Sequence, residues 1–349
     1  MYMNQKKIAV LFGGCSPEYK VSLESACGVL SHLNTQKYQT VMIGITPAGD
    51  WYHYTGPIDR IRDDSWQDPD LCKPLGLCLA GQSRGFVLLE NESTCPLPVD
   101  VVFPVLHGKN GEDGRVQGML ALTGLPVIGC GVLASALCMD KDRAHRLAHQ
   151  AGISVPAGGI IRQNNRSHDL EKLLGKLTYP LYVKPVAAGS SFGITRVTRP
   201  EELESALNSA FLYGEEALVE EEIPGFEVGC AILGNEHLTV GRVDEIELDG
   251  GFFDFTEKYT LKTSKIHMPA RISSDAEDRI RQAAVTVYRA LGCSGLARVD
   301  LFYTPQGKIV FNEVNTLPGF TAHSRYPSMM KGIGISFSEI LDSLIDLAI

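Results

Sequence analysis

Several features are missing from this sequence, and each absence excludes a class of function. The nine cysteines include no CxxC pair and no Cys/His metal spacing, so we expect reduced, buried thiols. No long run of lysine and arginine occurs and the net charge is -9, so we expect no nucleic-acid partner, because such a surface repels phosphate backbones. Internal repeats and low-complexity tracts are also absent, which excludes solenoids and disordered linkers.

The first apolar run is short. It breaks at Gly13-Gly14, so we expect neither a signal peptide nor a membrane span, and cytoplasm is the default location. With 44% hydrophobic and 21% charged residues the composition is that of an ordinary globular protein. A chain of 349 residues is longer than a single hydrophobic core usually organises, so two or three lobes are expected.

Apolar runs and helical patterns predict mixed α/β and α+β architecture in three lobes. Residues 1–129 form an α/β lobe with buried strands of a parallel sheet at 8–12, 40–46 and 99–106, whereas 50–98 carry few periodic signals. Residues 130–227 form a smaller α+β lobe, whose first helix starts after the N-cap Asp140 and stops at Gly152. Residues 228–349 form the third lobe, with a helix at 275–291, strands at 296–303 and 309–314, and a polar loop at 249–264.

Polar side chains interrupt the two last strands at matched positions. Residues two apart share a face of a strand, so Arg298 and Asp300 point together, as do Glu313 and Asn315. Asp300, Glu313 and Asn315 offer hard oxygen ligands without His or Cys, a set that suits Mg²⁺. The alternative is a plain ion pair of Arg298 with Asp300 or Glu313.

A second constellation is YPLYVKPVAAGSSFGI, residues 179–194, an apolar strand that leads through Lys184 into a Gly/Ser loop. Backbone N–H groups and hydroxyls of such a loop can wrap phosphate oxygens while the lysine supplies positive charge. The loop is not a Walker A sequence, and alone it is equally typical of a simple turn. Together with the Asp/Glu/Asn cluster it indicates nucleotide binding.

The chain resembles the D-alanine:D-alanine ligase family of the ATP-grasp superfamily nearly end to end. The resemblance lies in LFGGCSPEYKVSLES (11–25), VLHGKNGEDGRVQG (105–118), the lysine strand, EEEIPGFEVGCAIL (220–233) and EVNTLPGFTAHSRYP (313–327). Within the family it is most similar to vancomycin-resistance ligases that make D-alanyl-D-serine. The resemblance implies a three-lobed ATP-grasp fold behind an N-terminal parallel-sheet domain, and it suggests a homodimer formed through the first lobe.

The resemblance also implies roles for individual residues. Lys141, Lys184 and Ser191 would contact the ATP phosphates, Glu220 and Glu227 adenine and ribose, and Asp300, Glu313 and Asn315 two Mg²⁺ or Mn²⁺ ions. Glu18, Ser190, Lys258 and Tyr259 would close the first D-amino acid subsite, and Arg298 and the Gly319 N–H would hold the oxyanion. His107, Ser324, Arg325 and Phe255 would contact substrate.

Simpler interpretations remain open for four of these residues. Lys141 could be a solvated helix charge and Glu220 part of a solvated acidic face. Glu18 could be an acid at a helix start, and His107 a hydrogen-bonded structural histidine.

From these roles we expect ATP-dependent ligation of D-alanine to D-serine through a D-alanyl-phosphate, which yields a cell-wall precursor and vancomycin resistance. Lys258-Tyr259 stand where lactate-using relatives carry histidine, and Phe253, Phe255 and Arg325 depart from the D-alanine:D-alanine enzymes. The loop 249–264 is expected to be a lid, or else an ordinary surface loop. A housekeeping D-alanine:D-alanine ligase, another carboxylate-amine ligase and a non-catalytic nucleotide sensor are the alternatives. Lys184→Ala and Glu313→Gln are expected to suppress turnover and leave the fold intact.

Overall fold

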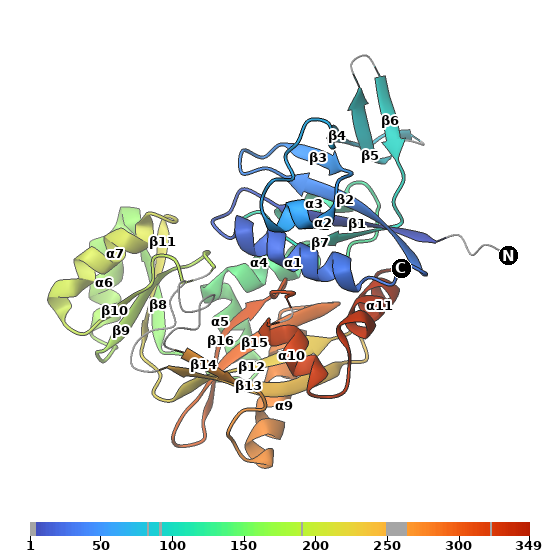
Figure 1. Ribbon diagram of the computed structural model, residues 1–349. Helices are drawn as coiled ribbons and strands as arrows, with labels where there is room; N and C mark the ends of the chain where they lie inside the picture. The colour runs from blue at the N-terminus through green and yellow to red at the C-terminus, as the bar shows by residue number, and fades with distance from the viewer. Residues whose placement is uncertain (1–4, 82–83, 91–92, 190, 249–263, 322) are drawn as a thin grey trace.

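The computed structural model describes residues 5–81, 84–90, 93–189, 191–248, 264–321 and 323–349. These residues form three β-sheets, each with helices packed against it (Figure 1). Ser190 and residues 249–263, with Phe255, Lys258 and Tyr259 of the predicted lid, lie outside the described residues.

The first sheet is parallel only at one end, where β7 is the edge strand. Strand β1 (Lys6–Gly13) pairs in parallel with β2 (Tyr38–Ile45) and β7 (Val101–Pro104), and α1 (Tyr19–His32) connects β1 to β2. Residues 8–12 are buried because both faces of β1 are covered, as their uninterrupted apolar run predicts. Helix α3 (Arg115–Ala121) packs on the face that carries Leu11 and Ile43.

The stretch 50–98, which gave few periodic signals, extends this sheet with antiparallel strands. It contains β3 (Trp51–Tyr54), α2 (Ile58–Arg62), β4 (Cys72–Cys78), β5 (Gly85–Glu90) and β6 (Ser93–Leu97), and the sheet order is β6-β5-β4-β3-β2-β1-β7. Trp66 is fully buried against Phe12 at a ring distance of 5.0 Å. The sequence prediction of a parallel sheet therefore describes one end of this sheet, β2-β1-β7, and misses its antiparallel extension.

The central lobe is a small antiparallel sheet of order β10-β9-β11-β8. Its elements are β8 (Gly158–Arg162), α6 (Arg166–Leu174), β9 (Leu181–Pro185), β10 (Thr195–Val197), α7 (Leu203–Phe211) and β11 (Glu216–Glu221). Single turns of 3-10 helix at Gln163–Asn165 and Pro200–Glu202 precede the two helices. Both helices pack on one face, and their apolar residues bury Val183 and Val219.

The third sheet is antiparallel and carries the predicted metal residues. Its order is β14-β13-β12-β15-β16, and its elements are β12 (Phe226–Leu233), β13 (Thr239–Leu248), β14 (Ser264–His267), α9 (Ser274–Ala290), β15 (Leu296–Tyr303), β16 (Ile309–Asn315) and α10 (Arg325–Lys331). Helices α4 (Val132–Met139) and α5 (Lys141–Gln150) pack in the core of this sheet together with α9. Asp140 caps α5 through the Arg143 N–H at 2.9 Å, as its position predicts.

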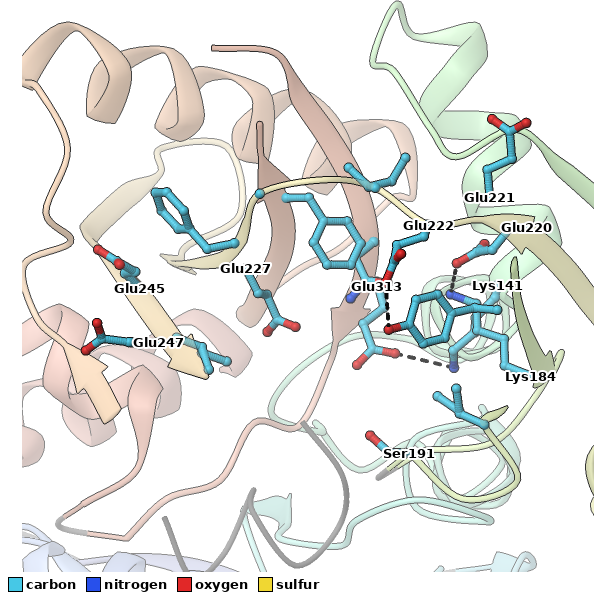
Figure 2. A pocket seen from close by; sticks show the side chains of 18 of the residues that line it. Lys141, Lys184, Ser191, Glu220, Glu221, Glu222, Glu227, Glu245, Glu247 and Glu313 are labelled. Atoms are coloured by element: carbon cyan, nitrogen blue, oxygen red, sulfur yellow. Dashed lines mark hydrogen bonds and ion pairs between the residues drawn. The ribbon is translucent and has the colours of Figure 1, made fainter. Parts of the chain in front are cut away.

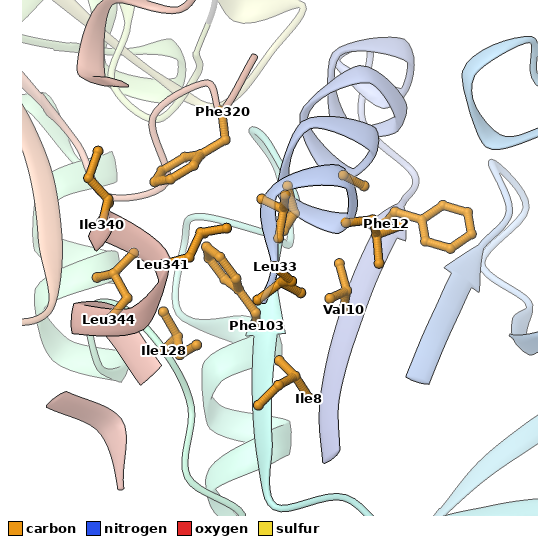
Figure 3. Packing of buried hydrophobic residues seen from close by; sticks show 14 of the residues in the cluster. Ile8, Val10, Phe12, Leu33, Phe103, Ile128, Phe320, Ile340, Leu341 and Leu344 are labelled. Atoms are coloured by element: carbon orange, nitrogen blue, oxygen red, sulfur yellow. The ribbon is translucent and has the colours of Figure 1, made fainter. Parts of the chain in front are cut away.

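The last helix, α11 (Phe337–Ala348), returns to the first lobe and packs against α1. Ile340, Leu341 and Leu344 join Val10 and Phe103 in one buried cluster (Figure 3). Residues from both ends of the sequence therefore share a core.

The nine cysteines are all free thiols, as expected from their spacing, but the expectation that they are buried is wrong for Cys15 and Cys95, which are exposed. Among the described residues, no helix combines the length and apolar character needed to cross a membrane.

Candidate active site

A pocket of about 400 Å³ lies between the central and third sheets, within the size range of small-molecule sites (Figure 2). Lys141, Lys184, Ser191, Glu220 and Glu227, the five residues predicted to contact ATP, all line it, together with Glu313. They come from α5, β9, the Gly/Ser loop, β11, β12 and β16. The fold therefore brings together residues that are up to 172 positions apart, from Lys141 to Glu313.

Two buried lysines carry positive charge into the pocket. Lys184 Nζ lies 2.6 Å from Glu220 Oε1, and Lys141 Nζ lies 3.4 Å from Glu313 Oε2. Lys141 Nζ also donates to the Ala188 carbonyl at 2.7 Å, next to the Gly/Ser loop. Lys141 is 5% exposed, so it is not the solvated helix charge that the sequence allowed.

The burial of the Lys184–Glu220 pair changes the stability expected for a Lys184 variant. Both side chains are almost inaccessible, at 5% and 6% exposure, so removing Lys184 leaves a buried carboxylate without its cation. Loss of one partner of a buried pair typically costs about 3 to 5 kcal/mol. We therefore expect Lys184→Ala to lower the melting temperature, in place of the unchanged stability expected from the sequence alone.

The remaining walls of the pocket were not predicted. Apolar side chains of Ile223, Phe226, Ile246 and Phe302 form one part, and carboxylates of Glu221, Glu222, Glu245 and Glu247 with Arg271 form another. Arg271 binds Glu245 at 2.6 Å and Glu247 at 3.0 Å. An apolar slot rimmed by acceptors suits a purine with its amino group and ribose hydroxyls, whereas the lysines suit phosphates.

The Asp/Glu/Asn cluster forms as the strand pattern predicts. In the β15–β16 register Asp300 stands opposite Glu313, and Arg298 opposite Asn315. Asp300 accepts from Arg298 at 2.8 and 2.7 Å and from Asn315 Nδ2 at 2.9 Å. The ion pair that the sequence allowed as an alternative is therefore present within the cluster.

The donor set of this cluster fits magnesium. Both carboxylates are hard oxygen donors, and the Asn315 amide, which donates its nitrogen to Asp300, leaves its oxygen as a candidate ligand. The described residues contain no group of three or more His, Cys, Asp or Glu placed to hold a metal. A bound Mg²⁺ would therefore also need oxygens from the Asn315 amide and from phosphate.

Arg325, a predicted substrate contact, lies in an acidic network at the start of α10. Its guanidinium binds Asp244 through two bonds of 2.8 Å and Glu227 at 2.9 Å, and it lies 3.4 Å from Asp300. It thereby links a pocket carboxylate to the Asp300 cluster. Ser324, the preceding predicted contact, accepts from the Thr321 N–H at 2.9 Å.

Glu18 lies where the first and central lobes meet. A Cβ atom added to Gly108 would be 2.0 Å from Glu18 Oε2, and one added to Gly189 would be 3.2 Å away. The side chain is buried, and Gly189 directly precedes Ser190, its predicted partner. Glu18 therefore borders the Gly/Ser loop, where Ser191 adopts a left-handed φ of 60°.

His107 is buried and both of its ring nitrogens are engaged. Nδ1 lies 2.9 Å from the Leu317 carbonyl and Nε2 lies 3.0 Å from Ser25 Oγ. Burial lowers the pKa of His107 to about 4, so the ring is neutral at physiological pH. The geometry is that of the hydrogen-bonded histidine that the sequence left open beside substrate binding.

This lowered pKa predicts a contribution of His107 to acid sensitivity. An unfolded histidine titrates near 6.5. Between about pH 6.5 and pH 4 the unfolded chain therefore binds a proton that the folded protein does not, so the free energy of unfolding is highest above about pH 6.5 and decreases as the pH falls toward 4. The loss amounts to about 3 kcal/mol at one pKa unit per 1.36 kcal/mol. We expect His107→Asn to be less stable at pH 7 but to lose less stability between pH 6.5 and 4.5. Urea unfolding of both proteins at several pH values measures this, and parallel pH curves would contradict it.

Comparison with known proteins agrees with this geometry. Residues 7–130 match the family model for the D-ala D-ala ligase N-terminus, and residues 147–346 match the model for its C-terminus. The chain is 48% identical over 98% of both chains to the vancomycin C-type resistance protein VanC1 of Enterococcus gallinarum. It is 43% identical over 99% of both chains to a putative D-alanine–D-lactate ligase of Streptomyces coelicolor.

Among solved structures, the VanG D-Ala:D-Ser ligase of Enterococcus faecalis is similar throughout. It shares 57% of its residues, covers 99% of this chain and 100% of its own, and superposes with a TM-score of 0.93. The two family models together span most of the chain, from the first sheet to α11. The protein therefore belongs to the D-Ala-D-Ala ligase family and is an ATP-dependent ligase with the ATP-grasp fold.

Proposed function

We propose that the protein joins D-alanine to D-serine with ATP and so makes a cell-wall precursor dipeptide that confers vancomycin resistance. The observation that carries this proposal is the end-to-end similarity, at 57% identity, to a D-Ala:D-Ser ligase. The pocket supports the ATP part, because two buried lysines stand beside a Gly/Ser loop and two carboxylate-bearing strands.

The reaction begins with activation of a carboxylate. A carboxylate oxygen of D-alanine attacks the γ-phosphorus of ATP, ADP leaves, and an acyl-phosphate forms. Lys141 and Lys184 hold the phosphate charges, and Glu18 holds the D-alanine ammonium. Asp300, Glu313 and Asn315 would bind Mg²⁺, which when present neutralises phosphate charge.

The second step forms the peptide bond. The D-serine amine attacks the acyl carbon and loses a proton, and phosphate leaves with the oxygen that came from the carboxylate. Arg298 and the Gly319 N–H would donate to the oxyanion, a role typically worth about 3 to 4 kcal/mol per donor. D-alanine labelled with ¹⁸O in its carboxylate tests the sequence of steps, because label must appear in the released phosphate.

We expect the mixed dipeptide to predominate when D-serine and D-alanine compete at equal concentration. An apolar pocket discriminates only weakly against an added hydroxyl, so some D-alanyl-D-alanine should also form. The buried Arg325–Asp244 pair supports a polar second subsite near the Asp300 cluster. Phosphate release, with product analysis by mass spectrometry, decides the question. Predominance of D-alanyl-D-alanine would identify a housekeeping ligase. Absence of phosphate release would instead favour a non-catalytic nucleotide sensor.

We also propose a cytoplasmic homodimer formed through the first lobe, with D-alanine and D-serine as its partners besides ATP. The resemblance to the family supports this proposal. Light scattering of the purified protein measures the mass, and a monomer would overturn it.

A further inference from the structure

The segment 315–320 of the third lobe is held by residues of the first lobe. Both backbone polar groups of Leu317 are engaged: its N–H donates to Glu112 Oε1 at 3.1 Å, and its carbonyl lies 2.9 Å from His107 Nδ1. Leu317 lies two residues after Asn315 and two before Gly319. The first lobe therefore binds the backbone between Asn315, a candidate metal ligand, and Gly319, a candidate oxyanion donor.

The directions of these bonds follow from the chemistry of the groups. A carbonyl can only accept, so His107 Nδ1 carries the proton and donates to Leu317. The neutral ring then accepts at Nε2 from the Ser25 hydroxyl, 3.0 Å away. Ser25 Oγ in turn accepts from the Phe320 N–H at 3.2 Å. One continuous chain of hydrogen bonds thus binds both ends of the Leu317–Phe320 turn to the first lobe.

The same network reaches the loop beside Glu18. Glu112 Oε2 accepts from the Gly108 N–H at 2.8 Å, and Gly108 borders the Glu18 carboxylate so closely that a side chain would not fit. Burial of the Glu112 carboxyl raises its pKa, and the negative charge of Glu18 raises it further. Glu112 therefore joins the loop at Glu18 to the loop at Gly319.

We propose that Ser25, His107 and Glu112 are positioning residues that fix the distance between the first-substrate subsite and the oxyanion donor. The inference rests on the proposed ligase reaction and assigns new roles to Ser25 and Glu112. Because reacting groups must be held to within about half an ångström, a loosened 315–320 segment lowers turnover without weakening ATP binding.

The sharpest test compares two serines on α1. Ser25 and Ser22 are both fully buried, but Ser22 accepts from the Gly13 N–H at 2.9 Å and donates to Val105, so its contacts stay within the first lobe. We expect Ser25→Ala to lower kcat roughly 10- to 100-fold and to leave KM for ATP within about 2-fold. Ser22→Ala, the matched control, should keep kcat within about 3-fold of wild type.

Amide hydrogen exchange provides a readout that does not depend on activity. The Phe320 amide, which donates to Ser25, and the Leu317 amide in the same turn should exchange roughly 10-fold faster in Ser25→Ala than in Ser22→Ala, because of the two serines only Ser25 bonds to that turn. His107→Asn, whose amide can still donate to Leu317, should retain more kcat than His107→Leu. If Ser25→Ala does not fold, this pair of variants tests the network instead.

Equal kcat in the two serine variants, or unchanged exchange of residues 315–320 in Ser25→Ala, would overturn the network. If instead wild-type protein releases no phosphate with D-amino acids, the proposed function fails, whereas the exchange comparison still tests the network.

Discussion

Lys184→Ala is expected to lower kcat/KM for ATP roughly 10³-fold, an effect of about 4 kcal/mol. The cause is the loss of a buried positive charge from a pocket that Ser191 of the Gly/Ser loop also lines (Figure 2). The variant should also unfold at a lower temperature, because Glu220 Oε1 loses its partner at 2.6 Å. Steady-state kinetics and calorimetry on the same preparation measure both effects.

A double variant separates the two effects of this substitution. Glu220→Gln removes the orphaned charge, so Lys184→Ala/Glu220→Gln should recover much of the stability and none of the turnover. Lys172→Ala, at an exposed lysine of α6 in the same lobe, serves as the control. Near-normal turnover in Lys184→Ala would remove this lysine from the phosphate site, and full recovery in the double variant would make its role structural.

Glu313→Gln is the second large loss that we expect, of roughly 10²- to 10³-fold in kcat at limiting magnesium. Its carboxylate faces the pocket from β16 and is one of two charged oxygen donors in the candidate metal cluster. The amide keeps the shape but loses the charge. Because Glu313 is 20% exposed and Lys141, its partner at 3.4 Å, keeps its bond to the Ala188 carbonyl, the melting temperature should fall less than in Lys184→Ala. The magnesium concentration for half-maximal activity should rise.

Glu222→Gln is a matched control, since Glu222 lines the same pocket but pairs with Arg196 at 2.7 Å outside the cluster. It should leave the magnesium dependence unchanged. If Glu313→Gln and Glu222→Gln share one magnesium profile, the metal assignment to Glu313 is wrong.

Local patterns in the sequence predicted much of this architecture. Strand β15 begins and ends where its apolar run does, and the period of two along β15 and β16 placed Asp300 beside Asn315 correctly. The helix after Asp140 likewise follows from its cap. These features depend on residues close together in sequence.

Features that depend on pairing across the chain could not be predicted in the same way. The bond between His107 and Leu317 spans 210 residues, and no local pattern distinguishes this histidine from a substrate ligand. The Lys184–Glu220 pair was predicted as two separate contacts, because the β9–β11 register that joins them is set by tertiary packing. The antiparallel strands of residues 51–97 were missed because their short runs alternate weakly.

Helix α11 has a consequence for how the chain folds during synthesis. Val29 of α1 and its C-cap residue Leu33 share a buried cluster with Ile340, Leu341 and Leu344, so this surface is complete only when α11 docks. Those residues are made roughly 300 positions later, which takes about 15 to 60 s at ribosomal speeds of about 5 to 20 residues per second. During that interval the nascent first lobe presents an apolar strip to its surroundings, so it is a natural client for a chaperone until the final helix emerges.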